Sequence, residues 1–158
     1  MDGFSTMYKI MLFLHLVTVV AAFAPMIIHP LLASRSAKDG PGVQRPVFGY
    51  MAANGRTIHL PALVLVGVFG LGMVFSSPEV GGGDENLWGF DQAWVSLSLL
   101  LWVAIGGIVS GMMLPAERQL ASGEGDAGAL EKKVTIGGQL VTVLFLVVVY
   151  LMIWKPGF

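Results

Sequence analysis

The sequence contains no cysteine, and few of its residues are charged. Without a thiol, the chain can form no disulfide, no thiolate metal site and no cysteine nucleophile. Charged residues make up 12% of the chain, whereas a typical soluble domain has about 25%. The formal net charge is −1, so the chain lacks the basic excess with which proteins bind nucleic acid. These absences exclude thiol chemistry and give no support for a nucleic-acid partner.

Four long apolar runs take up most of the chain instead. They lie at about residues 8–30, 58–77, 93–114 and 134–154, contain no Asp or Glu, and include a single basic residue, Lys9. Each run has about 20 residues, enough for a helix to cross a hydrocarbon core of about 30 Å. The hydrophobic share of 55% and the mean hydropathy of +0.76 agree with this interpretation. Only helices or closed barrels satisfy the backbone in lipid. We therefore predict an all-α polytopic membrane protein with one domain, residues 1–158, whose four transmembrane helices form an up-down-up-down bundle.

Basic residues are concentrated in two of the three segments that connect these runs. Those two segments contain Arg35, Lys38, Arg45, Arg56, Arg118, Lys132 and Lys133. The segment between the second and third runs has acidic residues and no Lys or Arg. Since cytoplasmic loops carry the excess of Lys and Arg, we predict that loops 31–57 and 115–133 are cytoplasmic and that both termini lie outside.

Small residues and prolines indicate how the helices pack. Glycines recur in the second, third and fourth runs, at residues 67, 70, 72, 106, 107, 111, 137 and 138. Small residues at helical spacing allow close approach of helices in a membrane, either within one chain or between subunits. Pro25 is expected to kink the first helix, whereas Pro61 falls in the first turn of the second helix, where proline is tolerated.

Three histidines, His15, His29 and His59, are the ionisable residues in or beside the runs that could carry chemistry. His29 closes the first run and His59 opens the second, so we expect both near the cytoplasmic surface. As a pair they are candidate axial ligands for a b-type haem, or ligands for a metal. The alternative is that each hydrogen-bonds to backbone or to lipid head groups. His15 lies about 21 Å from His29 along a helix, so the two cannot share one ligand.

His15 falls at mid-membrane depth in the first run. One interpretation is a neutral imidazole that donates a hydrogen bond to Ser96, Ser98 or a backbone carbonyl. The other is haem ligation or proton handling. The sequence leaves both open.

Several short motifs resemble those of a bacterial family of small four-helix integral membrane proteins. They are Leu14-His15 in the first run, Pro61 at the head of the second, Trp94 at the start of the third, and the closing Met152-Ile153-Trp154-Lys155-Pro156-Gly157. That family is distantly similar to the copper-resistance D proteins and the HemJ-type protoporphyrinogen oxidases. The resemblance covers nearly the whole chain. It implies a location in the bacterial cytoplasmic membrane, and it places His15 at the first-helix histidine that is linked to haem or porphyrin binding.

The sequence departs from the HemJ-type pattern in three places. Residues 17–25 contain one aromatic residue, Phe23, where those enzymes are rich in aromatics. Residues 26–32 contain His29 but no arginine, and the third run has no lysine. These departures argue against oxidase activity, and the lack of regularly spaced Met, His or Cys argues against copper transport.

No catalytic constellation is evident, because the runs hold no pair of carboxylates and the chain has no HExxH motif. The leading interpretation is a non-enzymatic membrane protein, embedded in the lipid bilayer as an accessory or interaction subunit of a larger membrane complex. The first alternative is a b-type haem-binding protein that uses His15, or the pair His29 and His59, in redox or tetrapyrrole chemistry. The second alternative is a homo-oligomeric small-molecule transporter. No cofactor is established by the sequence and no metal site is predicted.

Overall fold

The structure is a computed structural model that describes residues 4–78 and 87–156. Every regular element in these residues is helical. The α-helices are α1 (Thr6–Lys38), α2 (Pro41–Asn54), α3 (Leu60–Phe75), α4 (Ala93–Ile108), α5 (Leu114–Ser122) and α6 (Ala127–Trp154). Two π-helical turns, η1 (Gly55–His59) and η2 (Val109–Met113), join α2 to α3 and α4 to α5 without a break.

Four continuous helices result, and each is long and apolar enough to cross a membrane. They are Thr6–Ser36, Pro41–Phe75, Ala93–Ser122 and Ala127–Trp154. The predicted all-helical class with four candidate spans is therefore confirmed. The helices extend well beyond the apolar runs, so that residues 31–57 and 115–133, expected as loops, are largely helical. The turn before α2 contains Gly40, whose φ of 85° suits glycine, and Pro41 follows at the start of the helix, where its fixed φ is compatible.

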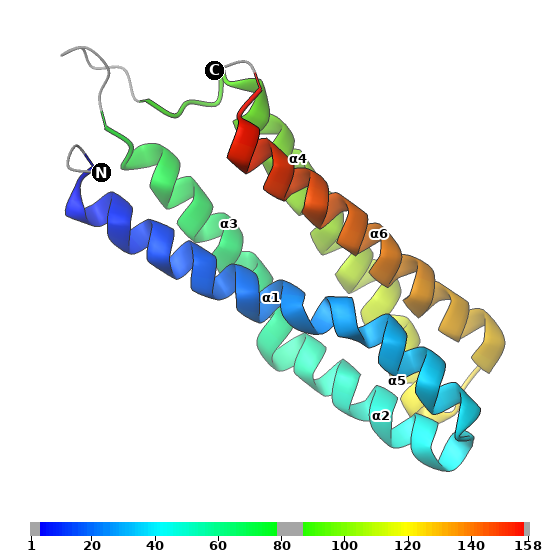
Figure 1. The fold of residues 1–158 in the computed structure, drawn as a ribbon. Helices are drawn as coiled ribbons and strands as arrows, with labels where there is room; N and C mark the ends of the chain where they lie inside the picture. The colour runs from blue at the N-terminus through cyan, green and yellow to red at the C-terminus, as the bar shows by residue number, and fades with distance from the viewer. Residues whose placement is uncertain (1–3, 79–86, 157–158) are drawn as a thin grey trace.

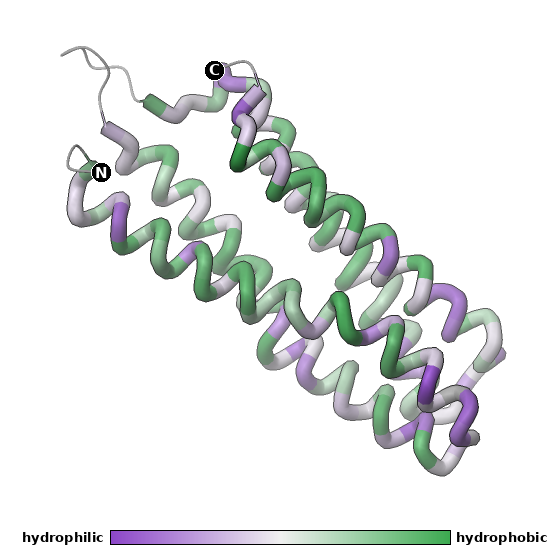
Figure 2. The backbone as a smooth tube through the Cα atoms, in the orientation of Figure 1, coloured by the Kyte–Doolittle hydropathy of each residue, from purple (hydrophilic) through white to green (hydrophobic). Residues whose placement is uncertain are grey.

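The start of α1 and the end of α6 lie at one end of the molecule, and the α1–α2 and α5–α6 connections lie at the other (Figure 1). Helix α1 packs against α3 and α6, α4 packs against α6, and α2 packs against α5. We call the part that contains α3 and α4 the terminal half and the part that contains α2 and α5 the hairpin half. Hydrophilic residues are most frequent toward the hairpin end (Figure 2).

The buried core consists of two apolar clusters. One occupies the middle of the bundle and includes Phe23, Met26, Leu63 and Ile105, with Phe23 stacked on Phe145 at a ring-centroid distance of 4.3 Å. The other fills the hairpin half with Ala33, Phe48, Met51, Ala116, Leu120, Leu130 and Val134. The hairpin half is therefore packed across α1, α2, α5 and α6.

The glycines divide into two groups. A Cβ atom on Gly67 would collide with the indole of Trp102, and one on Gly70 would lie 3.3 Å from Cε1 of His15. These glycines of α3 make room for side chains of neighbouring helices. By contrast, a Cβ on Gly106, Gly107 or Gly111 would meet no atom of the described residues of neighbouring helices within 4 Å. Close packing inside the chain therefore accounts for the glycines of α3. It does not account for those of α4 and η2, which no described residue of another helix approaches closely.

Candidate functional site

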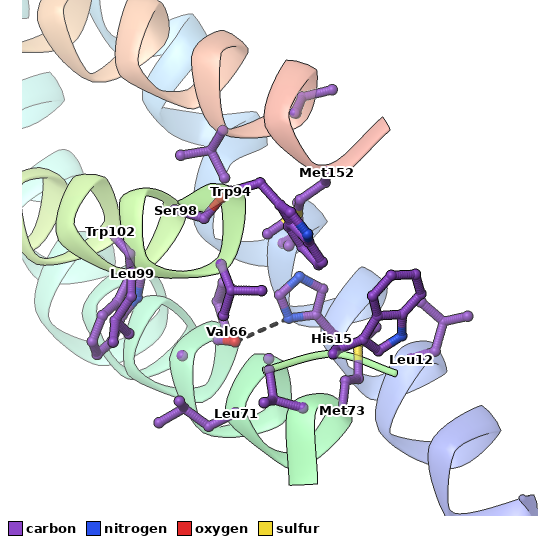
Figure 3. A pocket seen from close by; sticks show the side chains of 18 of the residues that line it. Leu12, His15, Val66, Leu71, Met73, Trp94, Ser98, Leu99, Trp102 and Met152 are labelled. Carbon is purple, nitrogen blue, oxygen red and sulfur yellow. Dashed lines mark hydrogen bonds between the residues drawn. The ribbon is translucent and has the colours of Figure 1, made fainter. Parts of the chain in front are cut away.

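A cavity of about 490 Å³ lies in the terminal half, bordered by α1, α3, α4 and α6. Its walls are aliphatic and aromatic almost throughout, and three indoles (Trp88, Trp94 and Trp102) contribute to them. Sites for small molecules and cofactors have volumes of roughly 300–1,000 Å³, mostly apolar walls and a few placed polar groups. The polar groups here include His15, Ser98 and Lys155. The cavity has the size and composition of such a site (Figure 3).

His15 is fixed in this cavity by the backbone of α3. Its side chain is buried, and Nδ1 lies 2.9 Å from the carbonyl oxygen of Val66. A carbonyl only accepts, so Nδ1 carries the hydrogen and donates it, which leaves the lone pair of Nε2 unprotonated in the neutral ring. Figure 3 shows the ring between Val66 on one side and Trp94 on the other. The hydrogen bond from His15 to a backbone carbonyl, which was one of the two interpretations of the sequence, is present, and it leaves the lone pair of Nε2 without a proton.

The rings of Trp94 and Trp102 are held in place because their indole N–H groups donate to protein atoms. Nε1 of Trp102 donates to the carbonyl oxygen of Leu63 at 2.8 Å, and Nε1 of Trp94 donates to Oε1 of Gln92 at 2.9 Å. The rings of Trp88 and Trp94 meet edge to face at a centroid distance of 5.4 Å. Aromatic walls of this kind favour an apolar ligand with flat faces.

Ser98 contributes a buried polar atom without a partner. Its Oγ is inaccessible to solvent and makes no hydrogen bond among the described residues. An unsatisfied buried hydroxyl costs about 1–3 kcal/mol, and such a group needs an explanation. Ser98 lines the same cavity as His15, so rotation of its side chain would bring Oγ to a polar atom of a ligand there.

His29, His59 and Glu117 form a second polar cluster, where the hairpin half begins. Nδ1 of His29 lies 3.2 Å from Oε1 of Glu117, and the two imidazole rings meet edge to face at a centroid distance of 5.6 Å. Glu117 is 1% exposed, and its Oε2 has no hydrogen-bond partner among the described residues. The structure therefore brings His29 and His59 together, which only one of the two interpretations of the sequence required, and adds a carboxyl group that the sequence analysis missed.

Local backbone features place these side chains. Pro25 has no N–H, so the carbonyl of Ala21 loses its helical partner. That carbonyl lies 3.2 Å from Nδ1 of His59, which donates to it. His59 closes the π turn η1, and Glu117 follows η2 within one helical turn. Single π turns are rare in helices overall, and those that occur are often found at functional sites.

Glu117 was overlooked because it falls outside the apolar runs. The available signal was its spacing, since Leu114, Glu117 and Leu120 are three residues apart and share one helix face. All three are buried. A face that carries two leucines predicts burial of the residue between them.

The two polar sites differ in what they can hold. The cavity of the terminal half is lined by His15 but not by His29, His59 or Glu117. Within residues 4–78 and 87–156, no group of three or more His, Asp or Glu side chains could hold a metal ion. The cluster of His29, His59 and Glu117 joins α1, η1 and α5 through polar contacts, whereas the cavity of the terminal half has the volume to hold a ligand.

Lys155 brings a cationic group to the cavity at the end of α6. Its Nζ lies 3.8 Å from the ring centroid of Trp88 and 5.7 Å from that of Trp94, within the range of cation–π contact. Lys155 lies just beyond the last residue of the fourth candidate span. Burial against the indoles lowers the pKa of the Lys155 ammonium from its ordinary value.

Comparison of the chain with protein-family models, with curated proteins and with solved structures gives no match. The resemblance to the copper-resistance D and HemJ-type families stays a prediction from short motifs.

Proposed function

We propose that this protein is a membrane-embedded four-helix bundle that binds a b-type haem, or a closely related flat tetrapyrrole, in the cavity of the terminal half. The observation that carries the proposal is the state of His15. Its Nδ1 is occupied by the Val66 carbonyl, and its Nε2 is available within an aromatic-walled cavity of about 490 Å³. Histidines that bind metal ions are held in this way, with the second ring nitrogen donating to a backbone carbonyl or a carboxylate.

The residues of the cavity fit such a group. His15 would supply an axial nitrogen ligand, and the indoles of Trp94 and Trp102 would pack against an apolar macrocycle. The unpartnered Oγ of Ser98 would donate to a polar atom of the ligand. When bound, a b-type haem supplies one-electron redox chemistry, whose potential depends on axial ligation and burial. The contribution of the chain is to hold the ring of His15 in one tautomer and to surround the ligand with apolar side chains.

We further propose that the bundle lies in the bacterial cytoplasmic membrane with an up-down-up-down order. Both termini would face outside, and the hairpin end would face the cytoplasm. Arg35, Lys38, Arg118, Lys132 and Lys133 support this orientation, since all lie toward the hairpin end of their helices and the cytoplasmic side carries the basic excess. The cavity would then open in the outer half of the membrane.

An absorption spectrum tests the haem proposal. The protein is expressed with ample haem, purified in a neutral detergent, and measured oxidised and then reduced with dithionite. We expect a Soret band with reduced α and β bands, lost in His15→Ala and retained in the matched variant His59→Ala. A spectrum with the protein band alone contradicts the proposal, and so does a Soret band that survives His15→Ala.

One observation favours the second candidate, an accessory or interaction subunit. Gly106, Gly107 and Gly111 present a small-residue surface on α4 and η2 that no described residue covers. Such surfaces admit a helix of another subunit at close range. Co-purification in mild detergent tests this candidate. A partner that is retained by Gly42→Leu, on the uncovered glycine of α2, and lost from Gly107→Leu would support it. No feature of the described residues favours the homo-oligomeric transporter.

A further inference from the structure

Lys155 is the charged residue that lines the cavity. The other described lining residues are apolar or neutral, apart from the imidazole of His15. The cavity thus has two chemically different polar positions, a nitrogen ligand on α1 and an ammonium group at the end of α6. A ligand that fills the cavity would meet both.

The position of Lys155 is fixed by the end of α6. The residue adopts a left-handed conformation, with φ of 44°, and its N–H donates to the carbonyl oxygen of Leu151 at 2.9 Å. Left-handed backbone costs a non-glycine residue roughly 1–2 kcal/mol, so a glycine at this helix end would be less strained. The strained conformation accompanies a side chain that lies over the indole of Trp88 and lines the cavity.

The ammonium of Lys155 has no carboxylate among the described residues. In that part of the chain the one contact between an acidic and a basic side chain is His29 with Glu117. Indole faces attract a cation through the ring quadrupole, but they do not replace the hydrogen bonds of a carboxylate. Burial lowers the pKa of Lys155, and an adjacent anion would favour its charged form again.

We infer that the ligand of this cavity is an anionic amphiphile, with an apolar body among the indoles and a carboxylate against Lys155. This inference rests on the proposed function, because it names the chemical class of the molecule in the same cavity. Two sources share that chemistry. One is a tetrapyrrole with propionate groups on one edge, and the other is a long-chain fatty acid from the membrane. His15 favours the tetrapyrrole, since a fatty acid contains no metal ion for the imidazole nitrogen to coordinate.

A comparison of two ligands with two variants tests the role of Lys155. Iron protoporphyrin IX and its dimethyl ester share one ring and one iron, and the ester lacks the carboxylates. Each is titrated into haem-free protein in a neutral detergent, and binding is followed at the Soret band. A charged hydrogen bond between ammonium and carboxylate predicts that the wild type prefers the acid by about tenfold. Lys155→Met should lose this preference, and Lys155→Arg should keep most of it.

An unchanged preference in Lys155→Met overturns the inference, whatever the affinity for haem. The melting temperature and elution volume of Lys155→Met are measured beside those of Lys155→Arg, so that loss of fold is recognised. A positive result places the carboxylate of the ligand at Lys155.

A second pair of ligands separates this inference from the haem proposal. If neither porphyrin binds, a brominated long-chain fatty acid and its methyl ester are added, and quenching of tryptophan fluorescence is measured. Quenching that favours the acid in the wild type but not in Lys155→Met supports the carboxylate at Lys155 and leaves the haem proposal refuted. Equal quenching by acid and ester in both proteins overturns the inference.

Discussion

The terminal and hairpin halves use histidine in opposite ways. In the terminal half, His15 donates from Nδ1 to the Val66 carbonyl and lines a cavity of about 490 Å³. In the hairpin half, His29 meets Glu117 at 3.2 Å, and both side chains are buried. Both rings are buried and belong to the same helix. What lies opposite the imidazole, space or a carboxyl group, is the difference on which the proposed ligand site at His15 rests.

The largest expected effect is the loss of stability when Glu117, in the hairpin half, is replaced. Glu117→Ala leaves the imidazole of His29 without its partner inside the bundle. An unsatisfied buried polar group costs about 1–3 kcal/mol, and the cavity left by the missing side chain adds to that cost. Unfolding in mixed micelles, followed by near-ultraviolet circular dichroism, measures the loss. Glu124→Ala, which removes an exposed carboxylate a few residues away, should change stability by about 0.5 kcal/mol or less. Equal effects of the two changes would mean that Glu117 contributes no more than a surface residue.

A smaller effect is expected where α3 accommodates Trp102. A Cβ on Gly67 collides with the indole, so Gly67→Ala must displace a ring that forms a cavity wall. Insertion of a methyl group into a packed site costs about 1–3 kcal/mol. Gly107→Ala is the matched control, because its Cβ meets nothing within 4 Å and alanine favours the helix by up to about 1 kcal/mol. Thermal unfolding in detergent measures both variants. A Gly67→Ala protein as stable as wild type would show that Trp102 has room to move.

Replacement of Ser98 is expected to affect the ligand-free protein and the haem-bound protein differently. Ser98→Ala removes a buried hydroxyl that has no partner among the described residues. The ligand-free protein should be unchanged or more stable by about 1 kcal/mol. Binding of haem to the variant should weaken, because the hydroxyl would no longer donate to the ligand. If Ser98→Ala instead lowers the stability of the ligand-free protein, the hydroxyl already has a partner and does not await a ligand.

The sequence predicts the terminal half better than the hairpin half. The apolar runs reveal α3, α4 and most of α1 and α6, because lipid-facing helices are apolar on nearly every side. They do not reveal α2 or α5, where buried residues such as Phe48 and Leu120 alternate with polar ones. For the same reason residues 115–133 read as a loop, and Glu117 went unnoticed.

Two features, one of the polar cluster and one of the cavity, could not be predicted from local sequence. His29 and Glu117 are 88 residues apart in the chain, and no motif connects them. The cavity is a volume that no side chain fills, so it depends on how four helices diverge and on where Gly67 and Gly70 place Trp102 and His15. One of the two interpretations of His15 from the sequence did include its hydrogen bond to a carbonyl, because a buried neutral imidazole needs an acceptor.

The smallest expected effect is the dependence of stability on the charge of Lys155. Burial lowers the pKa of this ammonium from its ordinary value of 10.5, so the folded chain releases the proton at a lower pH than the unfolded chain. In the pH window between these two values the unfolded chain holds more protons, and stability therefore rises with pH. Solvent reaches much of the side chain and screens the effect, so the rise should be slight. Unfolding in mixed micelles at several pH values up to 10.5 should show the rise in wild type and in the control Lys9→Met, whose lysine is exposed. The rise should be absent from Lys155→Met. A rise of stability with pH that persists in Lys155→Met belongs to other groups. Lys155 would then be as well solvated as Lys9. That result would remove one support for a ligand carboxylate at Lys155.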